Sequence, residues 1–173
     1  GNISECITIC AEVNIKAIKT RHSQNWVDEV IDDTEKLVER VKNAQKNKEI
    51  VSIAYHGNIV DVWESFYKNN ITVDIGSDQT SLHNPWSGGY YPVGYSFEEA
   101  NKMIYENPKK FKSEVKSSLK RHVEIINKHT KIGTYFFDYG NAFLLESSKA
   151  EADILKKDGS FKYPSYVQDI MGP

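Results

Sequence analysis

A nineteen-residue stretch in the middle of the chain, GSDQTSLHNPWSGGYYPVG (Gly76 to Gly94), concentrates side chains that can donate or accept hydrogen bonds or stack on a ring. Neither the period of a strand nor that of a helix runs through most of it, so the sequence predicts a long loop. Trp86, Tyr90 and Tyr91 can stack on a bound ring or pack against one another. Long loops in compact domains are usually binding or active-site loops, so we favour a binding loop over an Ω-loop that packs its own side chains.

Titratable side chains in and near this loop have more than one available role. His83 can hydrogen-bond a cofactor, anchor the loop or act as a general base, and we favour the cofactor role. Asp78 and Asp138 each follow an apolar segment. They can form an acid–base pair or cap turns, and we favour capping.

Apolar, β-branched segments separated by helical patterns must position these residues. The segments predict strands at 6–13, 50–56, 71–76 and 134–140. The first of these is almost wholly apolar, as expected of a strand covered on both faces. Strands that alternate with helices predict an α/β fold with a parallel sheet.

Helical spacing of apolar residues fills the intervals between these strands. One helical pattern begins at Trp26 and runs to Val41, with a break at Asp33 and Thr34 left open. The other predicted helices follow Gly57-Asn58, begin at a Ser96/Glu99 capping box and end near Asn107-Pro108, span a stripe from Phe111 to Ile126, and cover 141–155. His122 lies on that stripe, where we expect a hydrogen-bonded core or boundary histidine.

The unusual polar residues recur at the carboxyl ends of the predicted strands, where α/β sheets bind their ligands. They are Glu12, Gly57-Asn58, the residues from Asp78 to His83, and the run from Asp138 to Asn141. An acidic residue at the end of an apolar strand is the group that a dinucleotide site uses for a ribose hydroxyl, although such a Glu is more often simply solvated. The matching glycine-rich loop should lie about 20 residues upstream, before Gly1.

Composition excludes several classes of partner. There are 22 Lys and Arg against 24 Asp and Glu, so a formal charge of -2 argues against nucleic acid or an anionic membrane as partner. The two cysteines, Cys6 and Cys10, stand too far apart on a strand to bond each other and lack further ligands at metal-site spacing, so we expect buried apolar side chains and no metal. Two thiols without a disulfide framework favour a reducing compartment.

The central stretch, together with AEVN, YHGN, FFDYGNAFLLE and FKYPSYVQDIMG, resembles the urocanase (urocanate hydratase) family over essentially the whole chain. The resemblance implies a Rossmann-like, three-layer domain with a mostly parallel sheet over 1–160, lacking its first strand and glycine-rich loop, and a segment at 161–173 that returns to the rest of the enzyme. It also implies a cytoplasmic homodimer of histidine breakdown, in which tightly bound NAD+ acts as an electrophile while water adds to urocanate.

The family motif carries cofactor contacts onto individual positions of this sequence. Glu12 matches the ribose ligand, and the other implied NAD contacts are Asn58, Ile59, Gln79, Thr80, Ser81, Leu82, His83, Tyr90, Tyr91 and Tyr139. An arginine of bacterial relatives is replaced by Ala17, with Lys16 beside it. Cys6 and Cys10 do not match the family's known cysteine, and no catalytic residue is expected in this chain, which alone is expected to be inactive.

Two alternatives stay open on the residues themselves. The same sheet could belong to a dinucleotide-binding module without chemistry or to an NAD-dependent oxidoreductase, because fold does not determine function. An oxidoreductase would need a catalytic Lys, His or Tyr beside the nicotinamide, and no residue here is singled out for that role.

Overall fold

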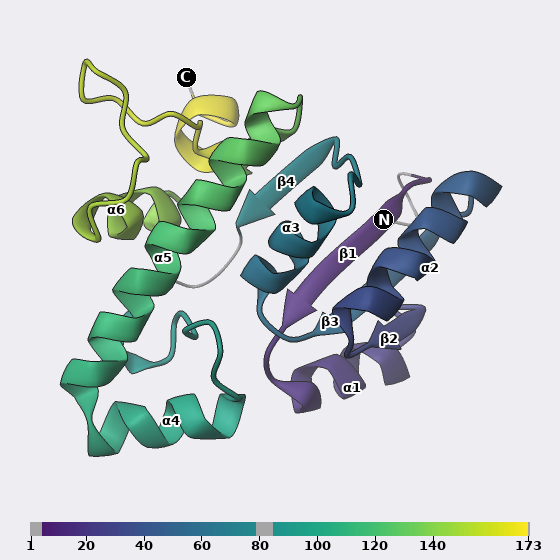
Figure 1. Cartoon of the computed structure of the whole chain (residues 1–173), viewed down its shortest axis with the longest axis horizontal. Coiled ribbons are helices and arrows are strands. Elements are labelled where there is room, and N and C mark those ends of the chain that lie inside the picture. The colour runs from purple at the N-terminus through teal and green to yellow at the C-terminus, as the bar shows by residue number, and fades with distance from the viewer. Residues whose placement is uncertain (1–4, 79–84, 173) are drawn as a thin grey trace. The chain divides into compact units, whose positions relative to one another are not determined.

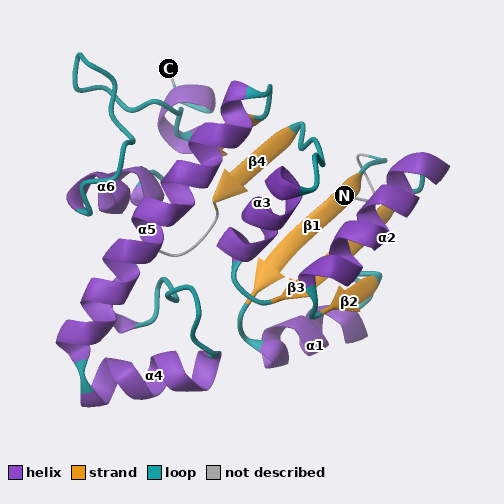
Figure 2. Cartoon of the chain, in the orientation of Figure 1, coloured by secondary structure: helices purple, strands orange, loops and turns teal. Residues whose placement is uncertain are grey.

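The computed structural model describes residues 5–78 and 85–172, which divide into two compact units, Gly1–Ile71 (unit 1) and Thr72–Pro173 (unit 2) (Figure 1). Each unit holds a small parallel sheet with helices packed against it. Figure 2 shows helices in purple and strands in orange. The predicted α/β class with parallel strands is confirmed. The described strands form two sheets, of three strands in unit 1 and of two strands in unit 2.

Unit 1 is built on the strand order β1-β3-β2, with all three strands parallel. In chain order it contains β1 (Ile7–Glu12), α1 (Ile15–Ser23), β2 (Glu29–Ile31), α2 (Thr34–Asn47), β3 (Val51–His56) and α3 (Ile59–Lys68). The central strand β3 is buried along most of its length. Apolar faces of α2 and α3 complete the core with Leu37, Val41, Val60 and Phe66.

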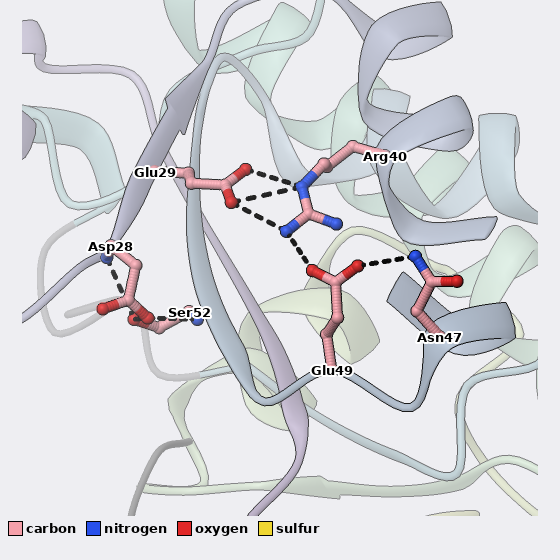
Figure 3. Close-up of polar contacts among 6 residues, drawn as sticks. All are labelled: Asp28, Glu29, Arg40, Asn47, Glu49 and Ser52. Atoms are coloured by element: carbon pink, nitrogen blue, oxygen red, sulfur yellow. Dashed lines mark hydrogen bonds and ion pairs between the residues drawn. The ribbon is translucent and has the colours of Figure 1, made fainter. Parts of the chain in front are cut away.

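Two elements of unit 1 differ from the sequence prediction. The helical pattern from Trp26 is wrong before Thr34, because Glu29–Ile31 pairs as β2 alongside β3. The side chain of Asp28 fixes this pairing by accepting hydrogen bonds from the backbone N–H and the hydroxyl of Ser52, both at 2.8 Å (Figure 3). Helix α1 was not predicted, and Ile18 is its one buried residue.

A three-residue ionic network joins β2 to α2 and to the loop before β3 (Figure 3). The Arg40 guanidinium donates to both oxygens of Glu29 and, at 2.6 Å, to Glu49. These hydrogen bonds raise the pKa of Arg40 above its ordinary value, while the amide of Asn47 and the guanidinium lower the pKa of Glu49. The network holds the short strand β2 in register.

Strand β1 is less covered than its sequence suggests. It lies at the edge of its sheet, pairs with β3 alone among the described strands, and is half-buried rather than covered on both faces. Cys6 and Cys10 are exposed, so the expectation of buried cysteines is wrong. Local desolvation and the charge of Glu12 nevertheless raise the pKa of the Cys10 thiol.

In unit 2, β4 (Ile75–Asp78) pairs in parallel with β5 (Tyr135–Asp138), and a long helix forms much of the core. Its other elements are the 3₁₀ turn Pro85–Ser87, α4 (Phe97–Glu106), α5 (Pro108–Lys131), α6 (Ala142–Lys149) and the π-helical turn Tyr166–Ile170. One face of α5 forms the core with Phe111, Val115, Leu119 and Ile126. Strand β4 begins four residues later than predicted, and α6 ends earlier, where Glu151 adopts a positive φ of 61°.

The junction of α4 and α5 follows the sequence signals closely. The predicted capping box at Ser96 and Glu99 is present at the start of α4. Asn107 is at once the C-cap of α4, with its N–H donating to Met103 O, and the N-cap of α5, with Oδ1 accepting from Lys110 N–H. Pro108 then occupies the first turn of α5, where a missing N–H costs nothing. We call this one-residue junction the Asn107 elbow.

Candidate functional site

The carboxyl edge of the sheet in unit 1 brings together two of the predicted positions. Glu12 ends β1 directly opposite His56, the last residue of β3. The backbone N–H of Gly57 donates to the Glu12 carbonyl at 3.0 Å, so Glu12 and the turn Gly57-Asn58 lie side by side. Two of the strand ends with predicted polar residues therefore lie at the same edge of the sheet in unit 1.

The Glu12 side chain is held in place by the turn that follows it. Its Oε1 accepts a hydrogen bond from the Asn14 backbone N–H at 2.8 Å, and Asn14 caps α1 by accepting from Lys16 N–H. The carboxylate is half-buried. Such a fixed carboxylate at a strand end is chemically suited to accept a hydrogen bond from a hydroxyl group.

Asn58 and Ile59 form the start of α3. The Asn58 side chain accepts from Val60 N–H at 3.0 Å and caps the helix, and Ile59 is its first residue. A Cβ on Gly57 would stand 2.5 Å from the Tyr55 ring, so only glycine fits between strand and helix without a shift. The positive end of the α3 dipole therefore faces the same edge as Glu12, where it favours an anionic group.

In unit 2, the corresponding edge is organised by Asp138. Asp78 and Asp138 are register partners at the ends of β4 and β5, and both are buried. Asp138 Oδ1 accepts a hydrogen bond from Gly140 N–H, and Oδ2 accepts one from Leu144 N–H. Both oxygens therefore bind backbone N–H groups at the start of α6. Burial raises the pKa of Asp138, although the backbone donors oppose that rise. Capping is confirmed for Asp138.

The segment after the 3₁₀ turn is attached to α4 and α5 by its aromatic side chains. Tyr90 is buried, with its hydroxyl 3.3 Å from His122 Nδ1, and burial raises its pKa well above the usual value. The Tyr91 hydroxyl donates to Asn101 Oδ1 at 3.1 Å, and Lys112 stands 4.6 Å over the ring of Trp86. These contacts favour aromatic packing within the protein. The role of Tyr90 and Tyr91 as cofactor contacts stays a prediction.

His122 is buried, as expected, at 1% exposure. Among the residues that the structure describes, its Nε2 has no hydrogen-bond partner. Its ring packs edge-on against Phe143 with centroids 4.8 Å apart. Burial lowers the pKa of His122 to about 3, which keeps the imidazole neutral. The expectation of a hydrogen-bonded core histidine is confirmed at Nδ1, which lies 3.3 Å from the Tyr90 hydroxyl.

Tyr139 differs from the other predicted tyrosines because half of it is open to solvent. It follows β5 directly, is 51% exposed and stacks on Tyr166 of the π-helical turn. Sequence reasoning missed Tyr166, although the aromatic residues of FKYPSYV (161–167) were a usable signal. The predicted contacts at Gln79, Thr80, Ser81, Leu82 and His83 lie outside the described residues.

Two further features are absent from the described part of the chain. No group of three or more His, Cys, Asp or Glu side chains in 5–78 and 85–172 is arranged to hold a metal ion. None of the helices in those ranges combines the length and apolar character needed to cross a bilayer.

Comparisons with known proteins show which family the chain resembles. Residues 1–170 match the family model for the urocanase Rossmann-like domain. The chain is 54% identical to a probable urocanate hydratase of Dictyostelium discoideum over 98% of its length, and 49% and 48% identical to the urocanate hydratases of Mus musculus and Homo sapiens, each over 96%. In all three cases it spans only 26% of the relative's own length.

The match agrees with the fold. Alternating strands and helices that form parallel sheets are what a Rossmann-like domain requires. The chain belongs to the urocanase family, and its residues 1–170 match the Rossmann-like domain of that family.

Proposed function

We propose that the chain is the cofactor-binding part of a urocanate hydratase and that its dinucleotide is NAD. The observation that carries this proposal is the family match over residues 1–170, together with relatives named urocanate hydratase at about half identity. A Rossmann-like domain supports a nucleotide cofactor in general. The implied contacts support NAD in particular, because Glu12 is the acidic residue that such sites use for an unphosphorylated ribose.

The described residues have the chemistry that this cofactor needs. The half-buried Glu12 carboxylate would accept a hydrogen bond from a ribose hydroxyl, since the Asn14 N–H already fixes its orientation. The start of α3 at Asn58 would favour the negative charge of a pyrophosphate. The exposed ring of Tyr139 would pack on a planar heterocycle. In unit 2, Asp138 holds the backbone that follows Tyr139 by accepting from Gly140 and Leu144.

The role we assign to this chain is to bind and orient. When bound, NAD+ would supply an electron-deficient ring that draws electrons from the imidazole of urocanate and makes it susceptible to water. We assign no proton transfer to a residue of this chain, because the carboxylate of Asp138 and the imidazole of His122 are buried in structural roles. We also propose that the whole protein is a cytoplasmic homodimer and that residues 161–173 lead to its remainder.

The test uses the full-length protein and its Glu12→Gln variant. Glutamine keeps an oxygen that can accept from Asn14 but removes the charge, so NAD+ affinity should fall about tenfold or more. Glu29→Gln, which alters the Arg40 network of the same unit, is the matched control and should leave NAD+ affinity unchanged. The wild-type protein is also assayed for urocanate consumption, which we expect to occur.

Two results would overturn the proposal. One is a full-length protein that holds no NAD and does not hydrate urocanate. The other is net transfer of a labelled hydride between NAD and a substrate, which would favour the oxidoreductase alternative.

A further inference from the structure

Tyr139 and Tyr166 form a parallel pair at the carboxyl end of β5. Their ring centroids lie 5.4 Å apart and their planes differ by 11°. This is the offset-stacked arrangement that aromatic pairs prefer at such separations. Tyr139 remains 51% exposed with one face covered by its partner, while Tyr166 is half-buried.

The backbone of Tyr139 is fixed on both sides. Its N–H donates to the Asp78 carbonyl at 3.1 Å, and its own carbonyl accepts from Val167 N–H at 3.3 Å. The preceding residue, Asp138, donates through its N–H to the Pro164 carbonyl at 3.0 Å. An exposed tyrosine with so constrained a backbone loses little further freedom when it binds something.

Tyr166 is itself held by the turn in which it lies. Ser165, directly before it, is buried and caps the π-helical turn: its N–H donates to Asp169 Oδ2 at 2.7 Å, and its hydroxyl accepts from Gln168 N–H. The ring of Tyr166 also contacts Phe137, with centroids 6.0 Å apart. Its position is therefore set by unit 2 and does not depend on a ligand.

Tyr135 provides an internal comparison. It is the first residue of β5, four residues before Tyr139, and has the same exposed fraction of 51%. Its ring meets Phe137 at 6.3 Å with a tilt of 39° rather than in a parallel stack. In a parallel sheet the carboxyl end is the ligand side. The parallel stack thus occurs at the end of β5 where a ligand is expected.

We propose that Tyr166 is a positioning residue that holds the Tyr139 ring as a stacking platform for a planar heteroaromatic ring of the bound dinucleotide. The inference rests on the proposed function, because it takes the ligand to be a dinucleotide. Tyr166 acts through Tyr139 and contributes an aromatic ring, with no required role for its hydroxyl. It turns a solvent-exposed tyrosine into a preorganised binding surface, which mainly slows ligand dissociation.

The experiment measures NAD+ affinity and dissociation rate in the full-length protein with Tyr166→Leu, Tyr166→Phe and Tyr139→Leu. Loss of one aromatic contact corresponds to about threefold to tenfold. Tyr166→Leu should raise the Kd by that factor, mostly through faster dissociation, and Tyr166→Phe should restore it. Adding Tyr166→Leu to Tyr139→Leu should cause no further loss. A purely structural Tyr166 would weaken binding in both backgrounds. Tyr135→Leu is the control and should leave affinity unchanged.

Two further measurements identify which ring of NAD stacks on Tyr139 and control for variants that fail to fold. ADP-ribose lacks nicotinamide, so its affinity is insensitive to Tyr166→Leu if Tyr139 stacks on nicotinamide and falls if it stacks on adenine; either result supports the platform. If Tyr166→Leu fails to fold, Tyr166→Met takes its place with the same expectation. NAD+ affinity that falls with Tyr139→Leu but is unchanged by Tyr166→Leu or Tyr166→Met would overturn this inference and leave the proposed function standing. A wild-type protein that does not bind NAD would overturn both.

Discussion

The two units stabilise their polar groups in opposite ways. In unit 1, the Arg40 network and the caps at Asn14 and Asp33 lie at partly exposed positions, where water shares the hydrogen bonding. In unit 2, Asp138 and His122 are almost wholly buried, so the protein alone must satisfy them. Buried polar groups are costly when a partner is lost, whereas exposed ones are tolerant. Unit 2 should therefore be the half that is sensitive to substitution and to acid.

The largest effect is expected from the helix caps. Asp138→Ala removes the acceptor for two backbone donors in a buried place and should lower the free energy of unfolding of unit 2 by about 2–4 kcal/mol. Asp33→Ala removes an exposed cap from α2 and should cost about 1 kcal/mol. Hydrogen exchange of α6 and α2 amides would measure both. Equal losses would contradict the contrast between units.

The second-largest effect is expected from acid, which should lower the stability of unit 2. The folded pKa of His122 is about 3, below the ordinary 6.5, so its contribution to stability is complete above pH 6.5 and is lost as the pH falls toward 3. By pH 5.5 the loss should reach about 1 kcal/mol. Asp138 opposes it, because a raised carboxyl pKa favours the folded state at low pH. The protection factors of the α5 amides, which correct for the slower intrinsic exchange in acid, should therefore fall on acidification, and His122→Leu should remove most of that pH dependence.

The ionic network of unit 1 should respond to salt instead. Arg40→Met leaves Glu29 and Glu49 to water, so we expect a loss of about 1 kcal/mol at low ionic strength. Screening should shrink that loss in high salt, while the loss from Asp138→Ala should be unchanged. Denaturant unfolding at two salt concentrations makes the comparison. A salt-independent Arg40 effect would mean that the network acts mainly through packing.

The smallest effects are expected where the two units are alike. Each carries a surface cation over a tryptophan: Arg21 lies 5.0 Å from Trp26 in unit 1, and Lys112 lies 4.6 Å from Trp86 in unit 2. Arg21→Gln and Lys112→Gln should each cost about 0.5 kcal/mol. Thermal unfolding of the two variants would test this. A much larger effect of Lys112→Gln would show that this contact stabilises more than the protein surface.

Local signals in the sequence predicted the elements that local chemistry determines. The Ser96/Glu99 capping box and the Asn107-Pro108 boundary are visible in a few residues, and the structure has both. The positions of Glu12 and Asn58 at strand ends followed from the apolar runs before them. The family resemblance, confirmed by the match over 1–170, rests on motifs of equally local character.

Long-range contacts determined what the sequence did not reveal. Glu29–Ile31 fits a helical period and is a strand only because β3 and the Asp28–Ser52 pair hold it. The apolar run of β1 suggests burial, but its place at an edge leaves Cys10 exposed. Likewise, no spacing rule links Tyr139 to Tyr166, because their stack depends on the bridge between Asp138 and Ser165.

The Asn107 elbow limits how the length of this chain can vary. One residue closes α4 and opens α5, so the two helices share a hinge with no spare backbone. Deleting it would remove both caps and rotate α5 by about 100° relative to α4, carrying Phe111 and Val115 away from the core. Surface loops commonly absorb insertions and deletions over evolution. The Asn107 elbow should not tolerate insertions or deletions, so homologous sequences should align through it without a gap.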